Sequence, residues 1–193
     1  MTPRCMDRTM QLVLAACITG CGATADTPAR RAATIIMEPV ALRLAAPRDT
    51  AATLQEMERF IAAVDRDTTR MEVMTRPVDI GADARGTARA WRIGRSWQRV
   101  QLDAGGAGFH TTDTWWLHEG AGVAARLESV RPNERPEVDH IRFRDSTLYR
   151  WTDASGRILN RDARSTRYQV DALRARLTRV LQQLDASSSA RDE

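Results

Sequence analysis

Apolar residues recur with two different periods along the chain, and these periods predict its secondary structure. Between residues 50 and 64 the spacing is three or four, which predicts an amphipathic helix of about four turns. Asp49 and Thr50 are both suited to cap its start. The expected apolar face of this helix consists of Leu54, Met57, Ile61 and Val64.

From Thr69 to Asn160 the period changes to two, which is typical of strands with one buried and one polar face. This region divides into seven or eight short strands separated by turn-rich segments, and the last candidate strand is GRIL at residues 156–159. Connections as short as these join antiparallel neighbours, so the strands are expected to form a meander.

A second amphipathic helix is predicted near the C-terminus, with Ser165 as its cap. Its apolar positions follow spacings of three and four over only about two heptads, whereas a coiled coil needs about three or four heptads. Packing on the sheet is therefore favoured over dimerisation, and a monomer is expected. These apolar positions are Val170, Leu173, Leu177, Val180 and Leu184.

Together these elements predict an α+β fold, with an antiparallel β-meander sheet of about seven or eight strands between an N-terminal and a C-terminal amphipathic helix. The domain is expected to span residues 49–185, with a disordered tail at 186–193. Residues 21–48 are predicted to be a tether, since they begin with small and polar residues. Within the tether, IIMEPVALRLA at residues 35–45 is apolar but broken by Pro39, so it is either a short edge strand or a segment laid against the domain.

The first residues have the pattern of a secretory signal peptide. A start containing Arg4 and Arg8 precedes an apolar run at residues 10–19, which is shorter than the ~20 residues of a membrane span. The sequences Leu-Ala-Ala-Cys17 and Ile-Thr-Gly-Cys21 both resemble the lipobox of bacterial lipoproteins. That resemblance implies cleavage before a cysteine that is then acylated and anchors the protein to a bacterial membrane.

Two observations favour Cys21 over Cys17 as the lipidated residue. Cleavage before Cys21 leaves a longer apolar core in residues 1–20, and it removes Cys5 and Cys17 with the leader. No free thiol would then remain in an oxidising compartment. The residue after Cys21 is glycine rather than aspartate, and by analogy with lipoproteins this points to the periplasmic face of the outer membrane if the cell has one.

The second half of the chain carries another resemblance. The run HIRFRDSTLYRWTDASGRIL, followed by the capped helix, is similar to a group of uncharacterised secreted or periplasmic bacterial proteins. They combine an N-terminal helix, an antiparallel meander and a C-terminal helix. The resemblance covers residues 50–185 in layout and 140–185 in motif, and it implies no catalytic residues.

The composition adds little to this picture. All 29 basic residues are arginine, and they alternate with 25 acidic residues to give a net charge of +4. A composition set by a GC-rich genome explains the arginines better than a phosphate-binding role. The chain therefore lacks a strong field of one sign, and nucleic acid is not an expected partner of an exported protein.

The sequence contains no recognisable catalytic or metal-binding motif. His110 and His118 would lie ~26 Å apart on one strand, so they cannot share a metal. His140 beside Asp139 is an ordinary pair on a strand. The chain has no G-x-S-x-G motif and no lysine that could activate a serine. No metal, no cofactor and no enzymatic activity are therefore predicted.

Tryptophan and arginine alternate in AWRIGRSWQRV (residues 90–100), and two further tryptophans follow in DTWWLH (113–118). Aromatic and guanidinium groups together bind glycans, anionic lipids and acidic peptides by stacking and ion pairing. If the domain is a binding module, these residues should form a partly exposed patch; the alternative is that the tryptophans belong to the core. The candidate ligand-binding residues are Trp91, Arg92, Arg95, Trp97, Arg99, Trp115 and Trp116.

The sequence thus favours a non-enzymatic binding or structural module anchored in the cell envelope, with an envelope protein, glycan or anionic lipid as its partner. The alternative is a lipid carrier similar to the half-barrel lipoprotein chaperones. An envelope hydrolase is less favoured. A hollow of several hundred Å³ would distinguish a carrier from a module with a filled core.

Overall fold

A computed structural model describes residues 37–44, 50–81, 84–106 and 108–189, and the residues from Ile36 onward form one compact unit. The leader, both candidate lipidation cysteines and the tether up to residue 36 lie outside the described residues. No helix in the described part of the chain is long and apolar enough to cross a membrane.

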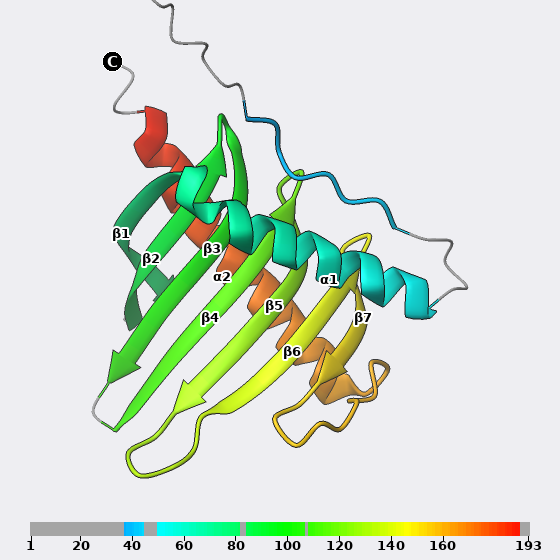
Figure 1. Cartoon of the computed structure of the whole chain (residues 1–193). Coiled ribbons are helices and arrows are strands. Elements are labelled where there is room, and N and C mark those ends of the chain that lie inside the picture. The colour runs from blue at the N-terminus through cyan, green and yellow to red at the C-terminus, as the bar shows by residue number, and fades with distance from the viewer. Residues whose placement is uncertain (1–36, 45–49, 82–83, 107, 190–193) are drawn as a thin grey trace, which may run out of the picture. The chain divides into compact units, whose positions relative to one another are not determined.

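Seven antiparallel strands form one sheet in sequence order, which confirms the predicted α+β meander (Figure 1). The strands are β1 (Glu72–Gly81), β2 (Ala84–Ile93), β3 (Ser96–Gly106), β4 (Phe109–His118), β5 (Ala121–Val130), β6 (Glu137–Arg144) and β7 (Thr147–Thr152). The eighth candidate, residues 156–159, is not a strand of the sheet, because it contributes only an isolated bridge between Ile158 and Thr152. Asp153 instead shapes this segment into a turn by accepting hydrogen bonds from the backbone N–H groups of Ser155 and Arg157.

Two helices cover opposite faces of the sheet, α1 (Thr50–Asp67) on one side and α2 (Arg164–Ser189) on the other (Figure 1). A short 3-10 helix, Thr68–Arg70, connects α1 to β1. The α1 stripe is rotated from the predicted one: Thr53, Met57, Phe60 and Val64 are buried, while Leu54 and Ile61 are half-buried at its edge. The polar Thr53 is buried because its hydroxyl accepts a hydrogen bond from Arg144 on β6.

Every apolar position predicted for the C-terminal helix is buried in α2: Val170, Leu173, Leu177, Val180 and Leu184. The helix begins at Arg164, so Ser165 lies in its first turn and is not its cap. Arg167 donates its backbone N–H to the carbonyl of Ala163, which makes Ala163 the flanking residue. The helix continues to Ser189, into the segment predicted to be a disordered tail.

Residues 37–44 belong to the domain and not to the tether. They have no regular secondary structure, and Met37, Val40, Leu42 and Leu44 pack against the hydrophobic cluster beneath α1. The backbone N–H of Val40 donates to the side-chain oxygen of Gln98 at 3.1 Å. This segment is therefore laid against the domain, as one of the two alternatives predicted.

The hairpins β2–β3, β4–β5 and β6–β7 share one geometry at the same end of the sheet. In each, the pairing skips one residue of the returning strand: Gln98, Val123 or Tyr149. Such β-bulges bend a strand and increase its twist. The turns that precede these bulged residues contain residues with positive φ, including Asp145 at 48° and Ser146 at 58°, which are unusual for residues other than glycine. These three turns form the rim beside α2 on which the candidate site lies.

Candidate functional site

The seven candidate ligand-binding residues do not form one surface. Trp91 and Trp116 belong to the hydrophobic cluster under α1, whereas Trp97 and Trp115 belong to the cluster under α2. All four indoles are buried, with 2 to 6% of each residue exposed. The expectation of a partly exposed aromatic patch was therefore wrong, because each face of the sheet is covered by a helix.

Under α1, Arg99 joins two tryptophans to the helix. Its guanidinium carbon lies 4.6 Å from the ring centroid of Trp91 and 5.9 Å from that of Trp116. It also pairs with Asp65 of α1 at 3.6 Å, and the indole N–H of Trp116 donates to the same carboxylate at 2.8 Å. Burial lowers the pKa of the Arg99 guanidinium from its ordinary value. These contacts attach α1 to the sheet, which is a structural role.

Of the remaining candidates, Trp97 and Arg92 make contacts within the fold, whereas Arg95 is exposed. The indole N–H of Trp97 donates to Asp185 of α2 at 2.7 Å. The guanidinium carbon of Arg92 lies 5.4 Å from the ring centroid of Trp97, and Arg92 forms an ion pair with Glu72 at 2.7 Å. Arg95 is exposed in the β2–β3 turn and lines a hollow beside α2.

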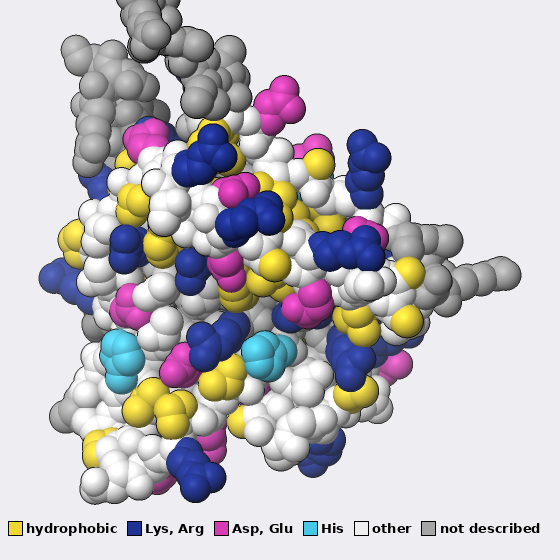
Figure 2. Space-filling view, in the orientation of Figure 1, with side chains coloured by type: hydrophobic (Ala, Val, Ile, Leu, Met, Phe, Trp, Pro, Cys, Tyr) yellow, Lys and Arg dark blue, Asp and Glu magenta, His cyan; other side chains and the backbone are white. Residues whose placement is uncertain are grey.

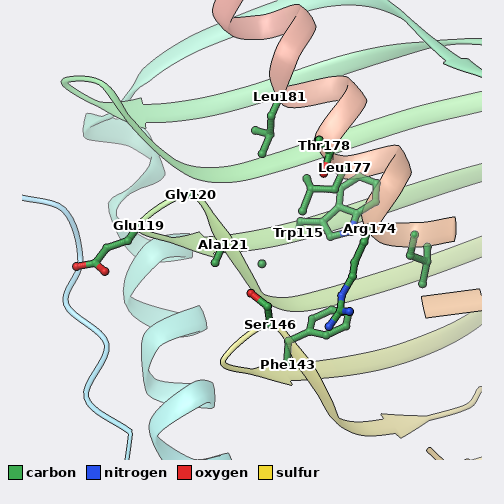
Figure 3. Close-up of a pocket in the computed structure, with 12 residues that line it drawn as sticks. Trp115, Glu119, Gly120, Ala121, Phe143, Ser146, Arg174, Leu177, Thr178 and Leu181 are labelled. Carbon is green, nitrogen blue, oxygen red and sulfur yellow. The ribbon is translucent and has the colours of Figure 1, made fainter. Parts of the chain in front are cut away.

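The structure contains a pocket that the sequence did not indicate, of about 380 Å³, between α2 and the turns of the β4–β5 and β6–β7 hairpins (Figure 3). We call it the α2 groove. Its apolar walls are Trp115, Phe143, Leu173, Leu177 and Leu181, its polar groups are Glu119, Ser146, Arg174 and Thr178, and the small residues Gly120, Ala121 and Gly122 leave space at its rim.

Arg174 is the unusual residue of the α2 groove. Its side chain extends from α2 toward Phe143 and Ser146 (Figure 3), and its guanidinium carbon lies 5.6 Å from the Phe143 ring centroid. One terminal nitrogen of this guanidinium is buried and has no hydrogen-bond partner. No carboxylate of the described residues forms an ion pair with it. A buried donor without an acceptor is rare and costs about 1–3 kcal/mol, more when it is charged.

Two further hollows adjoin the α2 groove along the same flank of α2. One, of about 460 Å³, shares Arg174 and adds Arg161 and Arg167 as well as Asp162 and Asp171. The other, of about 560 Å³, shares Glu119, Gly120 and Leu181 and reaches Trp97 and Arg95. The three hollows together form an elongated depression along α2. Its centre, the α2 groove, is mainly apolar, and the guanidinium of Arg174 lies where the groove meets the hollow of about 460 Å³.

Other candidate groups are engaged within the fold. Asp139, the neighbour of His140, accepts hydrogen bonds from the indole of Trp151 at 2.8 Å and from the backbone N–H of Ala154, so both of its carboxylate oxygens are engaged within the fold. Among the residues that the structure describes, no group of three potential metal ligands converges.

Comparison of the chain with protein families, curated sequences and solved structures found no match. The site is therefore interpreted from its own geometry.

The α2 groove was missed because no sequence signal marks it. Residues 167, 171, 174, 178, 181 and 185 follow helical spacing beside the apolar stripe of α2, but they are of mixed character. A mixed stripe beside an apolar one is ordinary at the edge of a packed helix. Only the position of the hairpin turns shows that this edge borders a cavity.

Proposed function

We propose that this chain is a lipid-anchored, non-enzymatic binding module of the bacterial cell envelope, and that the α2 groove binds an anionic amphiphile. The observation that carries the proposal is the buried, unpaired guanidinium nitrogen of Arg174 at the edge of an apolar pocket. The envelope location rests on the lipobox in the leader.

The chemistry of the groove favours a ligand with two parts. A carboxylate or phosphate on the ligand can accept a hydrogen bond from Arg174, which removes the cost of the unpaired donor. An alkyl or acyl chain can occupy the space between Leu173, Leu177 and Trp115, where burial of apolar surface contributes about 25 cal/mol per Å². A pocket volume of about 380 Å³ is typical of small-molecule sites.

The adjoining hollows favour an elongated ligand over a compact one. The apolar chain can continue from Leu181 toward Trp97, while the anionic group stays near Arg174. Binding in this manner needs little movement of the backbone, because the groove is already open between α2 and the two hairpin turns.

Calorimetric titration of the full mature protein with laurate and with its neutral counterpart dodecanol tests this function. We expect laurate to bind at least about ten-fold more tightly than dodecanol, because one charge-assisted hydrogen bond is worth roughly 1.5–3 kcal/mol. The Arg174→Gln variant should lose that preference. Arg164→Gln removes an exposed arginine from the same helix outside the groove and should bind both ligands like the unmodified protein.

A second variant tests the apolar half of the site. Ala121→Leu places a larger side chain at the rim of the groove and should weaken both laurate and dodecanol. Binding of laurate with equal affinity to the unmodified protein, Arg174→Gln and Ala121→Leu would contradict the proposal, as would no binding of either ligand to any of them. Circular dichroism of each variant checks that it is folded.

A further inference from the structure

A second hollow lies on the opposite face of the sheet, between α1 and the last two strands. It has a volume of about 360 Å³ and is lined by Leu54, Glu58, His140, Arg142, Arg150 and Thr152; we call it the β6–β7 hollow. Figure 2 shows this side of the molecule, where arginine, histidine and acidic side chains are interspersed over the strands beside α1. It shares no lining residue with the α2 groove.

The strand register brings the basic groups together. His140 on β6 is paired with Arg126 on β5 and with Thr152 on β7, so these three side chains lie side by side on one face. Arg142, two residues further on, is paired with Arg150. Three arginines and one histidine therefore surround a small area of the sheet.

Two of these arginines are paired with a carboxylate, but Arg150 has no ion pair among the described residues. Arg142 donates to Glu58 through two nitrogens and to the carbonyl of Ile141 through the third. Arg126 pairs with Glu128 at 2.8 Å. Arg150 makes one long hydrogen bond, 3.4 Å, from Nε to the hydroxyl of Thr152, and no described carboxylate forms an ion pair with it.

His140 is the second group with free hydrogen-bonding capacity. No described residue donates to its ring or accepts from it. Burial, followed by the charges of Arg142 and Arg126, lowers its pKa, while the carboxylates of Glu58 and Asp139 oppose that effect. An anion beside the ring would favour the imidazolium and reverse this lowering.

We propose that the β6–β7 hollow binds a phosphate group through the terminal nitrogens of Arg150 and the imidazolium of His140. A phosphate has several acceptor oxygens, so it can take hydrogen bonds from the guanidinium, the imidazolium and the hydroxyl of Thr152 from different directions. Glu58 does not prevent this, because its carboxylate is already paired with Arg142. The phosphate binds more tightly at lower pH, where His140 is protonated.

The test is an NMR titration of the histidine ring signals against pH, with and without inorganic phosphate at a constant ionic strength set by chloride. In the full mature protein we expect phosphate to raise the pKa of His140 by about 0.5–1 pH unit, because a nearby opposite charge favours the charged form. The rings of His110 and His118 are internal controls and should not respond. The Arg150→Gln variant should abolish the response of His140, and Arg150→Lys should retain part of it.

A matched control removes a charge elsewhere. Arg135 is exposed in the β5–β6 connection, and Arg135→Gln should keep the full response of His140 to phosphate. An unchanged His140 pKa in phosphate overturns the proposal, as does a response of equal size in Arg150→Gln or in added chloride. Arg174→Gln should respond like the unmodified protein, so this result does not depend on the α2 groove.

The source of the phosphate group is tested with vesicles. Vesicles of phosphatidylcholine with phosphatidic acid should sediment the unmodified protein more than Arg150→Gln if a lipid headgroup occupies the hollow. If only inorganic phosphate acts on His140, the ligand is a soluble phosphate.

Discussion

The two faces of the sheet are covered by helices in different ways. On the α2 side, five apolar residues of the helix enter the larger of the two hydrophobic clusters. On the α1 side the helix contributes Met57, Phe60 and Val64, and polar contacts add to the attachment, since Asp65 binds Arg99 and Trp116. Asp185 of α2 likewise accepts the indole N–H of Trp97, so the two attachments differ mainly in the apolar stripe, which is longer in α2. The polar contacts therefore carry a larger share of the attachment of α1.

The α2 side also contains an ion pair between a buried aspartate and a half-buried arginine. Asp113 of β4 accepts a hydrogen bond from Arg176 of α2 at 2.6 Å, and burial raises the pKa of this carboxyl group. A raised pKa means that burial destabilises the ionised carboxylate by more than the interaction with Arg176 stabilises it. This pair therefore positions α2 along the strands but adds little to the stability of the helix contact.

The largest expected effect comes from the α2 side. Leu184 is fully buried, so Leu184→Ala should lower the free energy of unfolding by about 2–5 kcal/mol in urea denaturation. Tyr168 lies on the same helix with 76% of its surface exposed. Tyr168→Ala should therefore change the free energy of unfolding by less than about 0.5 kcal/mol. Similar losses in both variants would mean that α2 does not pack as described.

A smaller loss is expected for the polar attachment of α1. Asp65→Ala leaves the indole N–H of Trp116 without its acceptor and the guanidinium of Arg99 without its ion-pair partner, which should cost about 1–2 kcal/mol. Among the described residues Asp67, in the same helix, pairs with the exposed Arg66, so Asp67→Ala is the matched control and should be nearly neutral. If the comparison is correct, high salt should reduce the effect of Asp65→Ala and leave that of Leu184→Ala unchanged.

A pH effect is expected on the α1 side. Burial, Arg142 and Arg126 lower the pKa of His140 in the folded protein below its ordinary value of 6.5. The unfolded chain then binds more protons, so this contribution to stability is present above pH 6.5 and is lost as pH falls toward the folded-state pKa. In the His140→Gln variant the urea midpoint of unfolding should change less with pH in this window. If it changes with pH as much as in the unmodified protein, His140 is not the cause of the pH dependence.

The smallest effect on the fold is expected at the leader. Cys21→Ala should abolish labelling of cells with an alkyne palmitate analogue and leave the melting temperature of the domain unchanged, because the domain begins after the tether. Cys17→Ala should be labelled normally. Labelling that persists in Cys21→Ala and disappears in Cys17→Ala would reassign the lipid to Cys17.

The strand pattern predicted more of the structure than the helix pattern did. Alternation places Trp115 and Trp116 on opposite faces, as expected, and short turns gave the meander. The stripe of α2 was predicted at every position, but that of α1 was displaced toward Thr53 and Phe60. A threonine counts as polar in the sequence, and its burial depends on Arg144, which is 91 residues away.

The candidate site was not predictable in the same way. The sequence left open whether the tryptophans form an exposed patch or belong to the core, because a strand pattern does not show whether a helix covers the second face. The sequence does not mark Arg174 as a site residue, because an arginine beside an apolar stripe is common. Whether Arg174 finds a hydrogen-bond partner depends on the residues packed around it, and these include the turns of two hairpins that are distant in the sequence.

The sequence by itself determined the local features: which residues form strands, where the chain turns, and which residues of α2 are apolar. These depend on neighbours within a few positions, where period and turn chemistry act directly. The tertiary structure decided the rest: the assignment of one helix to each face, the packing of residues 37–44, the bulges at Gln98, Val123 and Tyr149, and the two hollows. Each of these results from contacts between distant segments, whose geometry depends on how side chains of particular sizes and charges fit together.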